Sequence, residues 1–138
     1  MRFRYVLIFC AMLSGVFAGC QFLPSTDNKT TSNGTPHLVV QQPIHDFGQV
    51  AEGDEVGAVF WLTNGGDAPL IISKVKAGCG CTSVKWPEVP VAPGDSGKVE
   101  VLFNTRARSG MQSKSIEVFS NAPESPLELL FTAFVQPK

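Results

Sequence analysis

The sequence predicts an all-β protein: an antiparallel β-sandwich of about seven strands in one domain. Three observations support this prediction. The chain has 138 residues, a length typical of a single domain. Thirteen glycines and ten prolines supply many turns, and hydrophobic residues at 43% are enough for one core. From His37 onward, short apolar runs recur about every ten residues, and no stretch has a convincing helical period.

Residues 1–19 have the pattern of an export signal. Arg2 and Arg4 precede an uncharged apolar stretch at positions 5–18. That stretch is about 14 residues long, whereas a helix needs ~20 to span a bilayer. We therefore expect a cleaved signal peptide and not a membrane-spanning helix.

Cys20 is the predicted lipid anchor. Ala18 and Gly19 stand directly before it, and this arrangement resembles the lipobox of bacterial lipoproteins. The resemblance implies a thioether-linked diacylglycerol on Cys20, with acyl chains such as palmitate, and cleavage before it. Plain secretion, with Cys20 left as a free thiol, is the alternative. Gln21 replaces the aspartate that retains such proteins in the inner membrane, so the prediction favours the outer membrane, facing the periplasm or the exterior.

Residues 20–36 are predicted to be the lipidated N-terminus and a flexible linker, and residues 37–138 the folded domain. The linker is dominated by Ser, Thr, Asn, Asp, Gly and Pro, a composition that buries little apolar surface.

The predicted strands follow one another at short intervals. Apolar runs occur at 38–40 and at 46–50. The segment 56–63 is apolar at both its odd-numbered and its even-numbered positions, which predicts a strand buried on both faces. Asn64-Gly65-Gly66-Asp67 then signals a turn. Further strands are expected at 70–75, 82–86, 98–103, 114–120 and 127–135. Alternation places Val99, Val101 and Phe103 on one face. This succession predicts an immunoglobulin-like (Ig-like) sandwich.

Cys79 and Cys81 are the two cysteines of the predicted domain, and three interpretations compete. One is a disulfide, although in an extended strand their Cα atoms lie about 6.6 Å apart, at the upper limit for that bond. The ring that such a disulfide closes is small and adds little stability, so the disulfide interpretation includes a redox role for the pair. Another is a soft metal, Cu(I), because structural zinc would need both His37 and His45 as well. In the third, the cysteines are only buried apolar residues beside flexible glycines.

Other chemistry is sparse. Loss of residues 1–19, which hold two Arg and no acid, changes the net charge from −1 to −3, so no nucleic-acid partner is expected. Neither a nucleophile elbow nor a phosphate-binding loop is evident, and we expect no enzyme activity. Arg106 and Arg108 are candidate interface anchors in a solvated loop. Trp61, in the middle of a predicted strand, is expected in the core.

The order of motifs resembles a known family. The sequence carries His45-Asp46-Phe47-Gly48, Leu62-Thr63-Asn64, Pro69-Leu70, Cys79-Gly80-Cys81-Thr82, Pro93-Gly94 and Ser120-Asn121. This succession is similar to the bacterial family named domain of unknown function fifteen seventy-three, and to the Ig-like domains of the ASH/Hydin group. The resemblance implies an Ig-like fold and no established activity, and many members are exported or lipid-anchored.

These observations predict a membrane-anchored envelope lipoprotein whose domain is a binding or structural module for an envelope protein partner. The alternative is a redox-active or copper-binding protein that uses Cys79 and Cys81.

Overall fold

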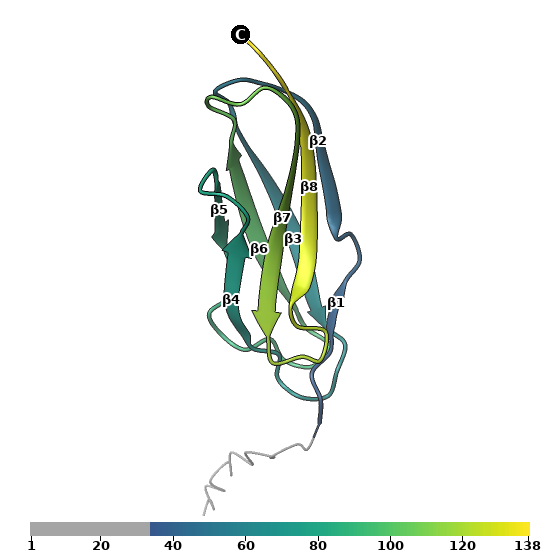
Figure 1. Ribbon diagram of the computed structural model, residues 1–138. Coiled ribbons are helices and arrows are strands. Elements are labelled where there is room, and N and C mark those ends of the chain that lie inside the picture. Colours follow the sequence, from purple (N-terminus) through teal and green to yellow (C-terminus); the bar gives the residue numbers. More distant parts are fainter. Residues whose placement is uncertain (1–33) are drawn as a thin grey trace, which may run out of the picture. The chain divides into compact units, whose positions relative to one another are not determined.

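The computed structural model describes residues 34–138, which form eight strands in two four-stranded sheets (Figure 1). The strands are β1 (Leu38–Val40), β2 (Ile44–Ala51), β3 (Glu55–Asn64), β4 (Ile72–Ala77), β5 (Thr82–Lys85), β6 (Ser96–Asn104), β7 (Gly110–Ser120) and β8 (Leu127–Gln136). The described residues include no helix that could cross a membrane. The predicted all-β, Ig-like sandwich is confirmed.

Each sheet combines strands that are distant in the sequence. One sheet has the order β1-β3-β6-β5, and the other has the order β2-β8-β7-β4. The chain crosses from one sheet to the other five times, first at residues 41–43, after β1, and among the later crossings at residues 78–81, after β4. β1 and β2 therefore belong to different sheets.

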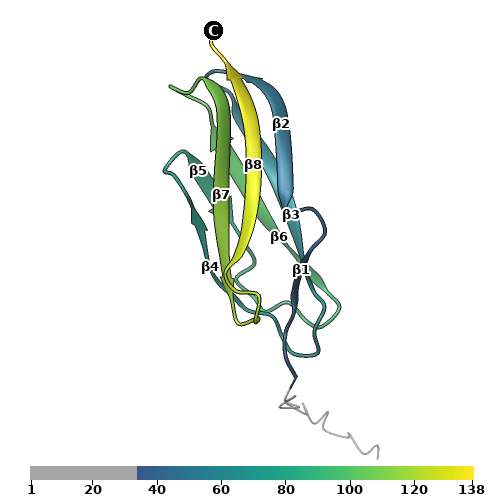
Figure 2. The same cartoon turned by 45° about the vertical axis from the view of Figure 1, so that its right-hand side comes forward.

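Most strand pairs are antiparallel, as predicted, but β2 and β8 are parallel. Their register runs from Ile44 opposite Leu130 to Ala51 opposite Gln136. The parallel pair arises because β2 enters the second sheet in the direction that it inherits from β1. β2 is thus an edge strand of that sheet, beside β8 (Figure 2).

The core lies between the sheets and is built by alternation along the strands. Val99, Val101 and Phe103 of β6 face inward and are at most 1% exposed, as the alternation predicts. From β8, Leu129, Phe131, Ala133 and Val135 are fully buried. The rings of Phe103 and Phe131 lie 5.2 Å apart between centroids, so aromatic contact joins the two sheets directly.

The expectation for residues 56–63 was wrong. Within residues 56–63 only the inward residues Ala58, Phe60 and Leu62 are buried, whereas Val59 is 49% and Trp61 59% exposed. Trp61 is therefore not a core residue. The outer face of this sheet has no covering layer among residues 34–138, and apolar composition alone does not reveal whether such a layer exists.

The two ends of the sandwich differ in what they carry (Figure 1). One end, called the base here, holds the first described residues and the loops β3–β4, β5–β6 and β7–β8. The other, called the far end, holds the C-terminus and the loops β2–β3 and β6–β7. A chain that enters the domain at Gly34 therefore enters at the base.

Candidate functional site

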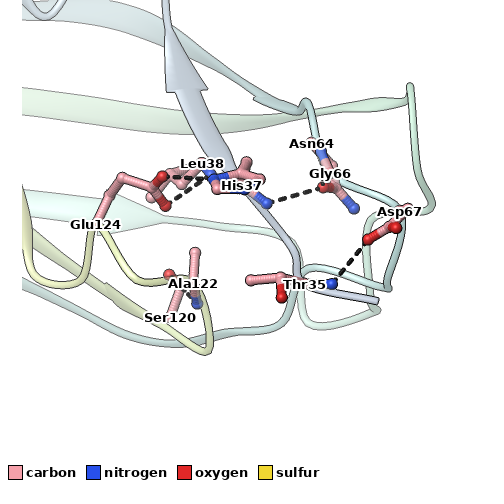
Figure 3. Close-up of polar contacts among 9 residues, drawn as sticks. All are labelled: Thr35, His37, Leu38, Asn64, Gly66, Asp67, Ser120, Ala122 and Glu124. Carbon is pink, nitrogen blue, oxygen red and sulfur yellow. Dashed lines mark hydrogen bonds and ion pairs between the residues drawn. The ribbon is translucent and has the colours of Figure 1, made fainter. Parts of the chain in front are cut away.

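The base binds the N-terminal segment of the domain through Asn64, the last residue of β3 (Figure 3). Its side chain is fully buried. Nδ2 donates hydrogen bonds to the carbonyl oxygens of Ala68 (2.8 Å) and Val91 (3.0 Å). Oδ1 accepts from the amides of Gly66 (3.0 Å) and His37 (3.4 Å). One side chain thus connects the loops β3–β4 and β5–β6 to the segment before β1.

Two carboxylates extend this attachment. Oε2 of Glu124, in the β7–β8 loop, accepts from the amide of Leu38 (3.2 Å), and its Oε1 lies 2.7 Å from Nδ1 of His37. Oδ1 of Asp67 accepts from the amide of Thr35 (2.7 Å). The hydrogen bond from His37, followed by bonds to backbone amides, lowers the pKa of Glu124 below its usual 4.5. Together with the bond to Asn64, these bonds hold the amides of Thr35, His37 and Leu38 (Figure 3).

Gly66 allows the segment to approach the turn closely. A Cβ atom at this position would lie 2.2 Å from the carbonyl oxygen of Thr35 and 2.6 Å from the amide nitrogen of His37. Both contacts are far shorter than van der Waals distance, so only glycine fits. The Asn64-Gly65-Gly66-Asp67 motif was predicted to be a turn, and its role as a receptor for residues 35–37 was missed.

Cys79 and Cys81 form a disulfide in the loop that connects β4 to β5. Their Cα atoms are 5.3 Å apart, closer than the ~6.6 Å of an extended strand, because the chain bends there. The amide of Gly78 donates to Ser115 O (3.1 Å) on β7, and Cys81 O accepts from Asn104 N (3.0 Å) on β6. The loop is therefore bonded to both sheets where the chain passes between them.

The surroundings of the disulfide do not support copper binding. Each sulfur is already bonded to the other, so neither is a thiolate ligand. Residues 34–138 contain no cluster of three or more His, Cys, Asp or Glu that could hold a metal. His37 is engaged with Glu124, and the ring of His45 packs edge-on against Phe47 at 4.6 Å. The hydroxyl oxygen of Thr82 lies 3.5 Å from Cys79 Sγ and 3.9 Å from Cys81 Sγ.

Asp46, from the motif at residues 45–48, lies in β2, and the candidates Arg106 and Arg108 lie in the β6–β7 loop. Asp46 accepts bonds from the amide of Gly48 (3.0 Å) and the hydroxyl of Thr132 (2.9 Å), which lower its pKa. Arg106 and Arg108 flank Ala107 in the β6–β7 loop at the far end, where Ala107 has a φ of 56°. Cys20, the signal peptide of residues 1–19 and the linker up to residue 33 lie outside the described residues.

A comparison of the sequence with known protein families shows which family the chain belongs to. The family described as "Protein of unknown function (DUF1573)" matches residues 38–135, from β1 to the end of the core part of β8. The chain belongs to this family. No curated protein matches the chain.

Solved structures similar to this DUF1573 domain show the same kind of fold. A protein of unknown function from Porphyromonas gingivalis W83 is 19% identical with a TM-score of 0.63, over 72% of this chain and 47% of that one. The ASH/PapD-like domain 7 of human CEP192 is 9% identical with a TM-score of 0.61, over 75% and 88%. The secreted serine protease VesC of Vibrio cholerae is 16% identical with a TM-score of 0.57, over 72% and 23%. The chain thus spans about half of the first protein and a quarter of the last. At these identities the likeness concerns the fold alone.

Proposed function

We propose that this chain is an exported lipoprotein, anchored in the bacterial envelope through Cys20, whose Ig-like domain is a non-catalytic binding or structural module. The observation that carries the proposal is the attachment at the base. Hydrogen bonds to Asp67, Asn64 and Glu124 fix residues 35–38 to the end of β3 and to the loops β3–β4 and β7–β8, so that a tether arriving at Gly34 is held at one end of the domain. The far end and the outer sheet faces are then free to meet a partner.

Export and the anchor rest on the sequence of residues 1–20. Two or three acyl chains bind a membrane stably, because each buried CH₂ contributes about 0.8 kcal/mol. Family membership agrees with an Ig-like module and supplies no activity. The favoured location is the outer membrane, facing the periplasm or the exterior, and the favoured partner is another envelope protein.

A labelling experiment in cells tests the anchor. Cys20→Ser is expected to abolish incorporation of a fatty-acid label, to leave the signal peptide uncleaved and to change the membrane fraction in which the chain is found. Cys10→Ser is the matched control, because Cys10 lies inside the apolar stretch and leaves with it. Unchanged labelling of the Cys20 variant would refute the anchor.

Crosslinking tests the binding role. Intact cells are crosslinked, and the full chain is compared with a variant in which Arg106 and Arg108 are both alanine. Capture of a defined envelope protein by the native chain supports the proposal, and loss of capture in the variant would assign it to the far end. If no envelope protein is captured and deletion leaves the envelope unaffected, the binding role is wrong.

A redox role for Cys79 and Cys81 is a second proposal, favoured by the disulfide of the β4–β5 loop. Thiol titration with mass spectrometry is expected to show a reversible mass change of about 2 Da, as two thiols form one disulfide. A disulfide that stays intact across cellular potentials would assign it a structural role instead.

A further inference from the structure

The outer face of the β1-β3-β6-β5 sheet carries an exposed apolar strip. Trp61 is 59%, Val59 49% and Leu102 40% exposed. Gly57 lies opposite Leu102 in the register, and a Cβ at Gly57 would lie 3.1 Å from Leu102 Cδ2, so the leucine leans over the glycine. An indole left in solvent in the middle of a strand adds nothing to the core, and contiguous exposed apolar surface is typical of a binding site.

Trp61 forms one wall of a groove on this face, and across β6 from it lies a second wall. It consists of Trp86 and Pro87, which directly follow β5. A Cβ at Gly97 would lie 2.7 Å from Pro87 Cγ, so this wall stands where it does only because residue 97 is glycine. Between Trp61 and this wall is a groove of ≈ 390 Å³, and a hollow of ≈ 260 Å³ continues it over Gly57 and Leu102. The groove therefore exists before any ligand arrives, and it has the shape to take an extended molecule.

Charged and hydroxyl groups line the groove between the walls. Lys98 donates a hydrogen bond to Glu100, and Lys85 lies opposite Glu100 in the register. Near Trp61, the hydroxyls of Thr63 and Ser96 are 2.9 Å apart. Two lysines against one glutamate leave the groove with one positive charge, in a protein whose mature part carries −3. The groove is thus electrostatically suited to an anionic ligand.

The strand pairing distinguishes between classes of extended ligand. A peptide that binds as a strand gains affinity from main-chain hydrogen bonds at a sheet edge. The floor strand β6 is paired with β3 along its length and with β5 at residues 100–103, so it offers no free main-chain groups at residues 100–103. Beside Gly97 the place of a pairing strand is taken by the side chain of Pro87, a residue that has no amide hydrogen to donate. A ligand here meets indole rings, ammonium groups, a carboxylate and hydroxyls. A sugar chain matches that set, because its ring faces stack on indole while its hydroxyls and carboxylates bond to the polar side chains.

We propose that the groove between Trp61 and Trp86 binds an extended acidic glycan, a polysaccharide strand whose sugars carry carboxylates. Trp61 is the stacking platform, and Lys85 and Lys98 pair with the carboxylates. This inference rests on the proposed binding role and names its ligand class.

Intrinsic fluorescence measures the binding directly, since the protein has two tryptophans and both line the groove. The full chain, purified in detergent, is titrated with hexagalacturonate and with peptidoglycan glycan strands stripped of their peptides. The methyl ester of hexagalacturonate is the matched uncharged ligand. We expect saturable binding of at least one acidic glycan, and at least tenfold weaker binding of the ester.

Substitutions locate the site. Trp61→Ala is expected to weaken binding of the acidic glycan at least tenfold. Calorimetry and the fluorescence of the remaining Trp86 measure the affinity of this variant. Phe134→Ala is the matched control, because Phe134 is 43% exposed on the other sheet and should leave affinity unchanged. Lys85→Gln is expected to reduce the difference in affinity between hexagalacturonate and its methyl ester. The unfolding temperature of each variant separates loss of binding from loss of fold.

Three results would overturn the inference: no binding of either acidic glycan, equal affinity for the acid and its ester, or native affinity in the Trp61 variant. If these occur while envelope proteins are still captured in cells, only the glycan assignment fails and the proposed binding role stands. Failure of both experiments would remove the binding role as well.

Discussion

Asn64 shows how a single buried amide organises the base. Its four hydrogen bonds use both amide hydrogens and both lone pairs of the oxygen, so the buried group is fully satisfied. The sequence identifies Asn64 as a turn residue because two glycines and an aspartate follow it. The partners at His37 and Val91 come from distant segments, and no local pattern predicts them.

Replacement of Asn64 by alanine should destabilise the protein by about 2–4 kcal/mol, since the carbonyl of Ala68 loses its side-chain donor and the amides of Gly66 and His37 lose their acceptor. The carbonyl of Val91 keeps the amide of Leu70 as a donor. Urea unfolding of the purified protein measures the change. Asn121→Ala is the control: this asparagine bonds to Ile71 and Pro69 but is exposed, so the expected loss is below about 1 kcal/mol. Equal losses in the two variants would contradict the role assigned to burial.

Ala107 holds a left-handed backbone conformation, with a φ of 56°, which is unfavourable for a residue with a Cβ. Ala107→Gly should therefore stabilise the protein by about 0.5–1 kcal/mol, as thermal unfolding would show. Ala92 is an exposed loop alanine without a positive φ, so Ala92→Gly should have no stabilising effect. A destabilised Ala107 variant would mean that the loop conformation is not costly.

The segment leading into β1 depends on a close contact with the β3–β4 turn. In Gly66→Ala the new Cβ would meet the backbone of residues 35–37, so the segment must move away. We expect faster hydrogen exchange at the amides of Thr35 and His37, and a stability loss of about 1–3 kcal/mol. Gly80→Ala is the control, because a Cβ there has no neighbour within 4 Å. Unchanged exchange in the Gly66 variant would refute the contact.

The same segment should respond to acid. The pKa of Glu124 is lowered in the folded protein, so its ionised form contributes stability above its usual pKa of 4.5. That contribution is lost as the pH falls through the lowered folded-state value. In an NMR titration, the amide of Leu38 should shift with a midpoint below pH 4.5, and Glu124→Gln should remove this transition. A midpoint at or above 4.5 would contradict the bond from His37.

The strands were predictable where one face is buried and the other is largely polar, as in β6. β8 was predictable because apolar residues recur at every second position from Leu127 to Val135, although Phe134 on its other face is also apolar. In β3 the pattern was misleading, since Val59 and Trp61 are apolar but point outward. The glycan groove was missed for the same reason: it depends on Trp61 being outside and on Pro87 packing against Gly97. The parallel pairing of β2 with β8 joins segments about 86 positions apart, which local periodicity does not report.

At the scale of the whole molecule, the two sheets are held together by aromatic contact. Phe131 meets Phe103 of the other sheet at 5.2 Å between ring centroids, and it also contacts Phe47 of its own sheet at 5.6 Å. Phe131→Ala should cost about 3–5 kcal/mol in urea unfolding, because it opens a cavity between the sheets. Phe134→Ala, on the same strand but the exposed face, should cost less than about 1 kcal/mol. Similar costs for the two would contradict the core described here.

The parallel pair β2–β8 also has a mechanical consequence. The described chain begins at the base and ends at the far end, so a pull on these two points acts along the strands (Figure 1). β2 would be drawn toward the base and β8 away from it. Their hydrogen bonds would then be loaded together in shear and would not open one after another from an end. Extension between the two ends must therefore break several bonds at once, which makes this domain well suited to carry tension.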